Sequence, residues 1–166
     1  MMLPLKTLSR DAIPMALAKA DRYRLLNEPL QAESICLDIL AADPENQNAL
    51  VILLLALTDQ IGHGYRLAEM EPADVLPRLK SEYERAYYAG IVDERQAKAV
   101  LDQSESHSGF LAFDLLTSAM SHYERAATLR PAGNDDALLR WNTCTRLMNS
   151  HGVKPRGEEP RESFLE

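Results

Sequence analysis

Residues 18–50 read AKADRYRLLNEPLQAESICLDILAADPENQNAL, and this stretch decides the fold. Its apolar residues recur at a spacing close to 3.6, which is typical of amphipathic helices. Asn27-Glu28-Pro29 separates two such helices, because proline cannot continue a helix but fits the first turn of the next one. Asp43-Pro44 is a second junction of this kind, with Asp43 as a good N-cap. The stretch therefore predicts a helix, a tight turn, a second helix and the start of a third.

The rest of the chain is expected to be helical as well. The helix that begins at Pro44 contains the longest apolar run, Ala49–Leu57, and a helix that is apolar almost all round must be covered on several sides. Gly62 and Gly64 end it, and residues 61–72 form a loop that is long for a helix connection. About six helices are predicted, over residues 11–26, 29–42, 44–60, 73–103, 110–129 and 136–149, with a bend of the long one expected at Gly90.

Composition agrees with a single all-α domain. The chain has 166 residues, of which 46% are hydrophobic and 26% charged, as is ordinary for globular proteins. Its net charge of −7 is the reverse of the basic surplus that nucleic-acid binding needs, and it also disfavours anionic membranes. The longest apolar run is far shorter than the ~20 residues of a membrane span. We therefore predict a cytoplasmic protein with neither a nucleic-acid nor a membrane partner.

Small residues recur within the predicted helix pairs. Two antiparallel helices approach closely only where small side chains meet, and an aromatic ring then fills the wedge beside them. The order small, aromatic, small occurs twice, as Ala20, Tyr23 and Ala32 before Pro44, and as Ala119, Tyr123 and Ala126 before Pro131. The second occurrence lies within residues 119–138, AMSHYERAATLRPAGNDDAL, and its junction with the next helix is like the junction at Pro44.

These two segments resemble tetratricopeptide repeats, in which each unit is a pair of helices about 34 residues long. The resemblance covers residues 16–60 and 116–148, whereas residues 61–115 depart from it. It implies an array of helical hairpins, with degenerate units, wound into a right-handed superhelix. Residues 9–150 would form this domain, with residues 1–8 as a short lead and residues 151–166 as a mobile tail.

The resemblance also implies a non-catalytic protein–protein interaction module, an adaptor or scaffold that binds a protein or peptide segment on a groove lined by the first helix of each unit. One version of the family clamps a terminal carboxylate with Lys, Arg and Asn. The matching positions here hold Leu17, Asp21, Val51 and Leu55, so we do not expect that clamp. The remaining groove candidates are Leu17, Asp21, Arg24, Asn142 and Arg146, for which a merely solvated helix face is the alternative.

Two aromatic residues are further candidates for partner binding. Trp141 lies on the last predicted helix, after which no helix follows. It is either covered by the tail or by earlier helices, or it anchors a partner or a second copy, as Trp often does. A homodimer through the last helix is therefore one hypothesis. Tyr83 and Tyr87 share a helix face and are expected in the core, whereas Tyr88 points about 100° away and is the better exposed candidate.

Catalytic signatures are absent from the sequence. GxSxG, HExxH and CxxC do not occur, and no glycine pattern would cradle a phosphate. Asp114, Ser118 and His122 share one face of a predicted helix, with His107 nearby, so a small helical metal-binding protein or enzyme is the alternative function. A solvated helix face accounts for the same stripe. We therefore predict no catalytic residue, no metal site and no cofactor.

Two further expectations concern single side chains. Cys36 and Cys144 fall among apolar helical positions and are predicted to be buried thiols, with a disulfide or a metal pair as the alternative. Glu94 is predicted to be a surface charge that pairs with Lys98 one turn later, a contact worth ~0.3–0.5 kcal/mol.

Overall fold

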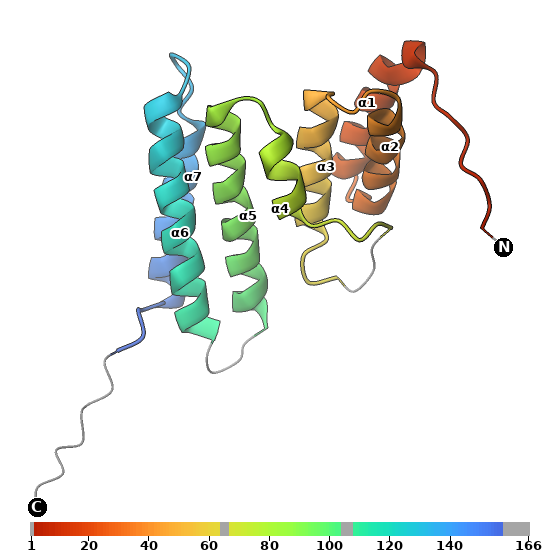
Figure 1. The fold of residues 1–166 in the computed structure, drawn as a ribbon. Coiled ribbons are helices and arrows are strands. Elements are labelled where there is room, and N and C mark those ends of the chain that lie inside the picture. The colour runs from red at the N-terminus through yellow and green to blue at the C-terminus, as the bar shows by residue number, and fades with distance from the viewer. Residues whose placement is uncertain (1, 64–66, 104–107, 158–166) are drawn as a thin grey trace, which may run out of the picture.

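A computed structural model describes residues 2–63, 67–103 and 108–157 of the chain (Figure 1). The described residues form α-helices and short 3-10 helices and no strand, which confirms the predicted all-α fold. None of the helices in these ranges is long and apolar enough to cross a membrane. In chain order the elements are η1 (Arg10–Ala12), α1 (Ile13–Leu25), α2 (Pro29–Ala42), α3 (Gln47–Asp59), α4 (Pro72–Val75), η2 (Leu76–Arg78), α5 (Glu82–Asp102), α6 (Ser108–Leu129) and α7 (Asp136–His151).

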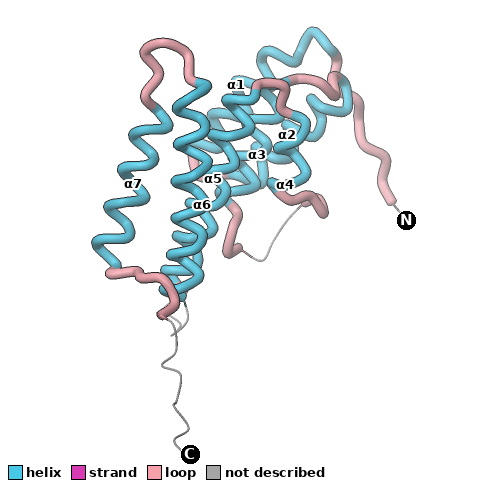
Figure 2. Tube along the Cα trace, turned by 60° about the vertical axis from the view of Figure 1, so that its left-hand side comes forward, coloured by secondary structure: helices cyan, strands magenta, loops and turns pink. Residues whose placement is uncertain are grey.

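Successive helices pack side by side as hairpins. α1 packs against α2 and α2 against α3, while α5 makes the most extensive contact in the molecule with α6, which in turn packs against α7. α3 also contacts both α1 and α5, so it joins the two ends of the array. Figure 1 shows α2 in front of α1 and α6 in front of α7, with the α1–α2 pair and the α6–α7 pair at opposite ends of the row. Figure 2 shows α7 at one edge of the row, beside α6.

The alanines of the repeated pattern lie where the helices touch. Ala20 and Ala32 have no exposed surface, and neither do Ala119 and Ala126. Because these side chains are small, the paired helices can approach closely at those points. Tyr123 is buried beside its two alanines, as the pattern predicts.

The apolar interior consists of two clusters that meet at α3 and α5. The first core is built mainly from α1, α2 and α3, and its centre is the apolar run of α3, including Leu50, Leu53 and Leu54. The second core is built from α5, α6 and α7, around Leu116 and Tyr123. The prediction that the third helix would be a centre of burial is therefore confirmed for the first core.

Tyr88 lies at the boundary of these two cores and packs against both. Burial raises the pKa of Tyr88 to about 12. The prediction that Tyr88 is exposed is therefore wrong, because the residue is half-buried, whereas its role in partner binding stays a prediction. It rested on the position of Tyr88 relative to Tyr83 and Tyr87 on one helix, whereas a second apolar surface, from the α1–α3 side, covers that face as well.

The junctions between the first three helices differ in their caps from the predicted ones. Asn27 ends α1 in the left-handed conformation, with φ of 61°, which asparagine tolerates well. Asn46, not Asp43, caps α3, because its side-chain oxygen accepts a hydrogen bond from the backbone N–H of Ala49 at 2.9 Å. Asp43 instead accepts a hydrogen bond from the Asn46 amide at 3.2 Å, so it orients the cap.

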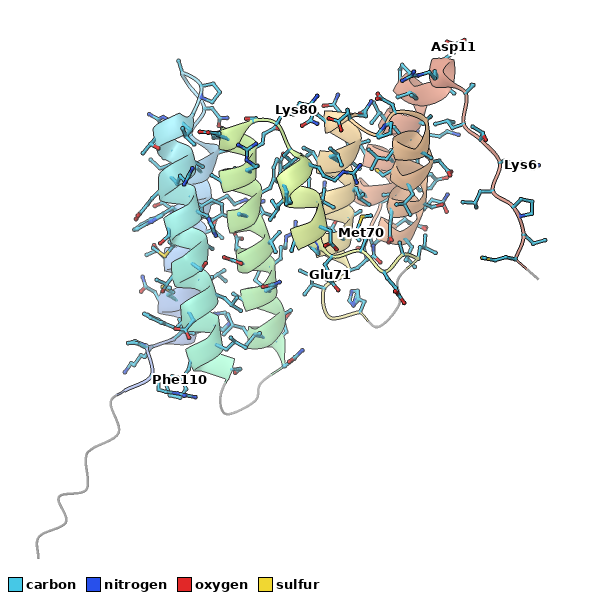
Figure 3. All side chains as sticks on the ribbon, viewed as in Figure 1. Lys6, Asp11, Met70, Glu71, Lys80 and Phe110 are labelled. Atoms are coloured by element: carbon cyan, nitrogen blue, oxygen red, sulfur yellow. The ribbon has the colours of Figure 1, made fainter. Side chains whose placement is uncertain are left out.

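The predicted helix over residues 73–103 is in fact two helical segments separated by residues 79–81, of which Leu79 and Ser81 are extended. Pro77 lacks a backbone N–H and disfavours helical continuation, and Ser81 restarts the helix by capping the N–H of Glu84 at 3.2 Å. The N–H of Lys80 in this break donates to the side-chain oxygen of Gln47 at 2.9 Å. Figure 3 shows Lys80 on the connection between α4 and α5.

Gly90 is a point of close approach between α5 and the Tyr123 side chain of α6. α5 continues without a break through this residue. Gly90 therefore does not interrupt the helix but allows close contact with α6. A Cβ at position 90 would lie 2.5 to 2.9 Å from three atoms of the Tyr123 ring, which is nearer than carbon atoms can pack. The glycine therefore sets how closely the two longest helices approach each other.

The segments that flank the helical domain are partly held by it. Leu8 in the predicted lead packs against the first core. After α7, Val153 packs against the second core, and the Arg156 guanidinium lies over the Phe110 ring at 5.8 Å from its centroid. The rest of the predicted tail, residues 158–166, lies outside the described residues.

We predict that Gly90→Ala lowers the free energy of unfolding by about 1–3 kcal/mol, because the added methyl group collides with a buried ring. Alanine in a helix interior would otherwise stabilise by ~1 kcal/mol. Urea denaturation measures the difference. Gly109→Ala in α6 is the matched control, because nothing lies within 4 Å of its added Cβ, and it should be neutral or stabilising. Equal effects of the two substitutions would contradict the close approach.

The two buried thiols predict a loss of stability at alkaline pH. Cys36 and Cys144 are free and buried, and burial raises the pKa of each to about 12 from 9.0. Above pH 9 the unfolded thiols ionise while the folded ones do not, so folding free energy is lost as pH rises from 9 towards 12. Replacing both cysteines with alanine should flatten this slope in denaturation curves measured between pH 8 and 11, and an unchanged slope would contradict it.

Candidate functional site

The described surface has a polar cleft of about 530 Å³ where α1, α3 and α5 meet. Each helix contributes charged side chains: Arg24 from α1, Asp59 from α3, and Arg95 and Lys98 from α5. Because these helices belong to successive hairpins, the cleft exists only when the hairpins are stacked. Other residues of the wall are Leu25, Asn27, Thr58, Ile61, His63, Ala99 and Asp102.

Asp59 lies at the centre of this cleft, between two arginines. Its Oδ2 is 2.9 Å from Nε of Arg24, and its Oδ1 accepts a hydrogen bond from Nη1 of Arg95. Asp59 is also the last residue of α3, where the partial negative charge of the helix C-terminus opposes a carboxylate. The two arginines offset that repulsion, and together the three side chains carry one net positive charge.

Glu94 forms a second centre between α5, α6 and α7, next to the cleft. Its side chain is 1% exposed and accepts hydrogen bonds from the Tyr123 hydroxyl at 2.7 Å, from Nζ of Lys98 at 2.6 Å and from Nη1 of Arg140 at 3.2 Å. The predicted Glu94–Lys98 pair is therefore confirmed, whereas the prediction that Glu94 lies on the surface is wrong. Periodicity on α5 alone could not show that α6 and α7 cover this position.

Burial and the charge of Glu94 act in the same direction on Tyr123. Both raise the pKa of the phenol, so the hydroxyl stays protonated and donates its hydrogen to Glu94. For Arg140, burial acts to lower the pKa, but the charge of Glu94 and a hydrogen bond with Tyr87 outweigh it and raise the pKa. The network around Glu94 is therefore complementary in charge and in hydrogen bonding.

Glu94 is buried far more deeply than its cations, at 1% exposed against 37% for Lys98 and 34% for Arg140. Asp59 is 17% exposed, about as much as Arg24 at 18% and less than Arg95 at 26%. A molecule entering the cleft therefore meets cationic groups first, although the whole chain has a net charge of −7. Asp102, one turn after Lys98 on α5, is an exposed carboxylate in the same wall and reduces the local positive charge.

The structure brings only one of the predicted groove residues, Arg24, into this cleft. Leu17 is half-buried against the first core, and Asp21 is exposed on α1. Trp141 and Asn142 lie together in a separate, largely apolar groove between α6 and α7.

Two of the predicted site residues on α7 differ in their surroundings. Trp141 is half-buried, and its indole N–H donates to Oε1 of Glu124 on α6 at 3.1 Å, so earlier helices cover part of the ring. Arg146 is exposed on the same helix. Asp59, Arg95 and Arg140, which the structure places in the charged centres, were not singled out by the sequence.

The side chains of Asp114, Ser118 and His122, which suggested a metal or acid–base site, make other contacts. The Ser118 hydroxyl donates to Oδ2 of Asp93 at 2.6 Å, and Nε2 of His122 lies 3.5 Å from the same oxygen. Asp114 lies elsewhere, in a shallow pocket near Phe110. Within the described residues no three His, Cys, Asp or Glu side chains are grouped so as to hold a metal ion, and His107 lies outside those residues.

Comparison with protein-family models, with curated protein sequences and with solved structures finds no match to this chain. The likeness to tetratricopeptide repeats therefore rests on the residue pattern, and the charged cleft is interpreted from its own geometry.

We predict that Glu94→Gln lowers the free energy of unfolding by about 1–3 kcal/mol, because two cations then lose their buried counter-charge. Asp102→Asn is the matched control, since it neutralises an exposed carboxylate on the same helix and should change stability by less than about 0.5 kcal/mol. Chemical denaturation at neutral pH compares the two. A stability loss no larger for Glu94→Gln than for the control would show that the network is not structural.

Proposed function

We propose that this chain is a non-catalytic protein-binding module of the tetratricopeptide-repeat type, which holds a segment of a partner protein in the cleft across α1, α3 and α5. The observation that carries the proposal is the composition of that cleft: three helices from successive hairpins contribute side chains to one surface hollow. The first helices of stacked hairpins form the binding face in the family that the sequence resembles, and α1, α3 and α5 would be those helices here.

The local charge supports a partner segment that carries acidic side chains. The acidic composition of the whole chain favours a basic or neutral partner, but the cleft has a different local balance. Arg95 and Lys98 are partly exposed above carboxylates that are more deeply buried. A carboxylate of the partner could therefore approach cations whose geometry is already ordered by Asp59 and Glu94, which lowers the entropic cost of binding.

This mode of recognition differs from the carboxylate clamp of the family. The positions of that clamp hold residues such as Leu17 and Asp21, neither of which lies in the cleft wall. The cations come instead from the last turn of α1 and from the C-terminal half of α5. Specificity would then come from the spacing between Arg95 and Lys98 and the apolar wall formed by Leu25 and Ile61.

A peptide-display screen with the intact chain as bait tests this proposal. We expect enrichment of segments with Asp or Glu, and we expect Arg95→Gln/Lys98→Gln to weaken their binding by at least about tenfold, equivalent to 1.4 kcal/mol. Binding should also weaken as the salt concentration rises. Fluorescence anisotropy with the best peptide measures both effects.

The matched control is Arg22→Gln/Arg125→Gln, which removes the same charge from exposed positions on α1 and α6 outside the cleft wall. This variant should bind the selected peptide as the unmodified chain does. Selection of basic or purely apolar segments, or an equal loss of affinity in both double variants, would contradict the proposed cleft.

A further inference from the structure

The end of the array farthest from α1 has a groove that no helix of the described chain covers. This α6–α7 groove has a volume of about 340 Å³ and is lined by Tyr123, Glu124, Ala127, Ala137, Leu138, Trp141 and Asn142. Leu138 is 47% exposed in this groove, whereas Trp141, three residues later on α7, is half-buried. An apolar groove at the open end of a repeat array marks a surface suited to a further chain segment.

The opposite end of the molecule has an exposed apolar segment. Residues 2–8 form an arm that is anchored at Leu8 and otherwise extends away from the body (Figure 1), and Met2, Leu3 and Leu5 are 97%, 80% and 90% exposed. Pro4 fixes its own φ and biases Leu3 towards an extended conformation. Pro4 therefore favours the extended conformation that a segment adopts along a groove, so docking would cost less conformational entropy.

Charge also matches the arm to the groove. Residues 2–8 contain Lys6 and no acidic residue, so the arm carries one positive charge in an acidic chain. Figure 3 shows Lys6 on the extended arm, beyond Asp11. Glu124 is exposed at the rim of the groove, and its bond with the Trp141 indole engages Oε1, which leaves acceptor capacity on the carboxylate.

The arm cannot reach the groove of its own chain. Residues 2–8 span at most about 25 Å when fully extended, and Leu8 is held against the first core. The path from α1 past α3 and α5 to α7 crosses three interhelix spacings of roughly 8–10 Å each, before the arm could turn around the end of the row. An arm that docks in this groove would therefore come from another molecule.

We propose that the N-terminal arm of one copy, residues 2–8, docks in the α6–α7 groove of a second copy, with Leu3 and Leu5 against Leu138 and Trp141 and with Lys6 at Glu124. This contact uses a different face from the charged cleft and does not depend on the function proposed for it. Because the donor and acceptor surfaces differ, the contact is heterologous and joins copies either reciprocally into a pair or in an open chain.

Sedimentation velocity on the full-length chain tests this contact with three variants that leave the net charge unchanged. The arm variant Leu3→Ser/Leu5→Ser and the groove variant Leu138→Ser should each weaken self-association by at least about tenfold. Leu111→Ser is the matched control, because Leu111 is 51% exposed on α6 outside the groove, and it should associate as the unmodified chain does. Circular dichroism checks that each variant remains folded.

Mixing the two weakened variants gives the decisive result. The arm variant retains an intact groove and the groove variant retains an intact arm, so an equimolar mixture should form a one-to-one complex that neither variant forms alone. Lys6→Glu should weaken association by roughly 2- to 5-fold, and pairing it with Glu124→Lys on the other copy should restore it.

Three results would overturn the proposal. The first is an unmodified chain that stays monomeric throughout the millimolar range. The second is an arm variant that associates normally, which would indicate α7-to-α7 pairing. The third is an association that is lost when the chain ends at Gly157 but is kept in the arm variant, which would assign the groove to residues 158–166.

Discussion

The contact between α5 and α6 around Glu94 is the constraint on which the rest of the structure depends. A carboxylate that is 1% exposed is costly unless every acceptor site finds a donor, and here Tyr123, Lys98 and Arg140 supply them from three helices. The Tyr123 ring can reach this position only because Gly90 has no side chain to displace it. The polar centre and the close helix approach therefore require each other, and together they specify one register for α5, α6 and α7.

The packing of the second core determines where the cleft and the groove lie on the surface. Once α5 is fixed, its other face presents Tyr88 to the first core and Arg95 to Asp59, so the two cores share one helix. The charged cleft forms along this shared boundary. The proposed binding function and the ends of the array then fall on separate surfaces: a polar cleft across the first helices of the hairpins, and an apolar groove where the row of helices ends.

Local patterns in the sequence predicted most of the fold, and contacts between distant residues account for most of what they missed. α2, α6 and α7 lie within two residues of their expected bounds, because turn signals such as Pro29 and Pro131 are local. The break before α5 was missed because it depends on Pro77 and on a hydrogen bond from Lys80 to Gln47, 33 residues away. In the cleft, Arg24 was among the predicted residues, but Asp59 and Arg95 were not, since they are paired across 36 residues. One signal was present: Arg24 and Asp59 both lie in the last turn of the first helix of a stacked hairpin, and such ends lie close together.

Native-state hydrogen exchange across the chain tests the central claim most directly. If the Glu94 network and the Gly90 contact hold α5 and α6 as one unit, the amides of residues 88–97 and 116–126 will be the slowest to exchange. They will do so at a common rate that tracks global unfolding as urea is added. Slowest exchange in α3, with α5 and α6 opening separately and well below the global free energy of unfolding, would contradict the account.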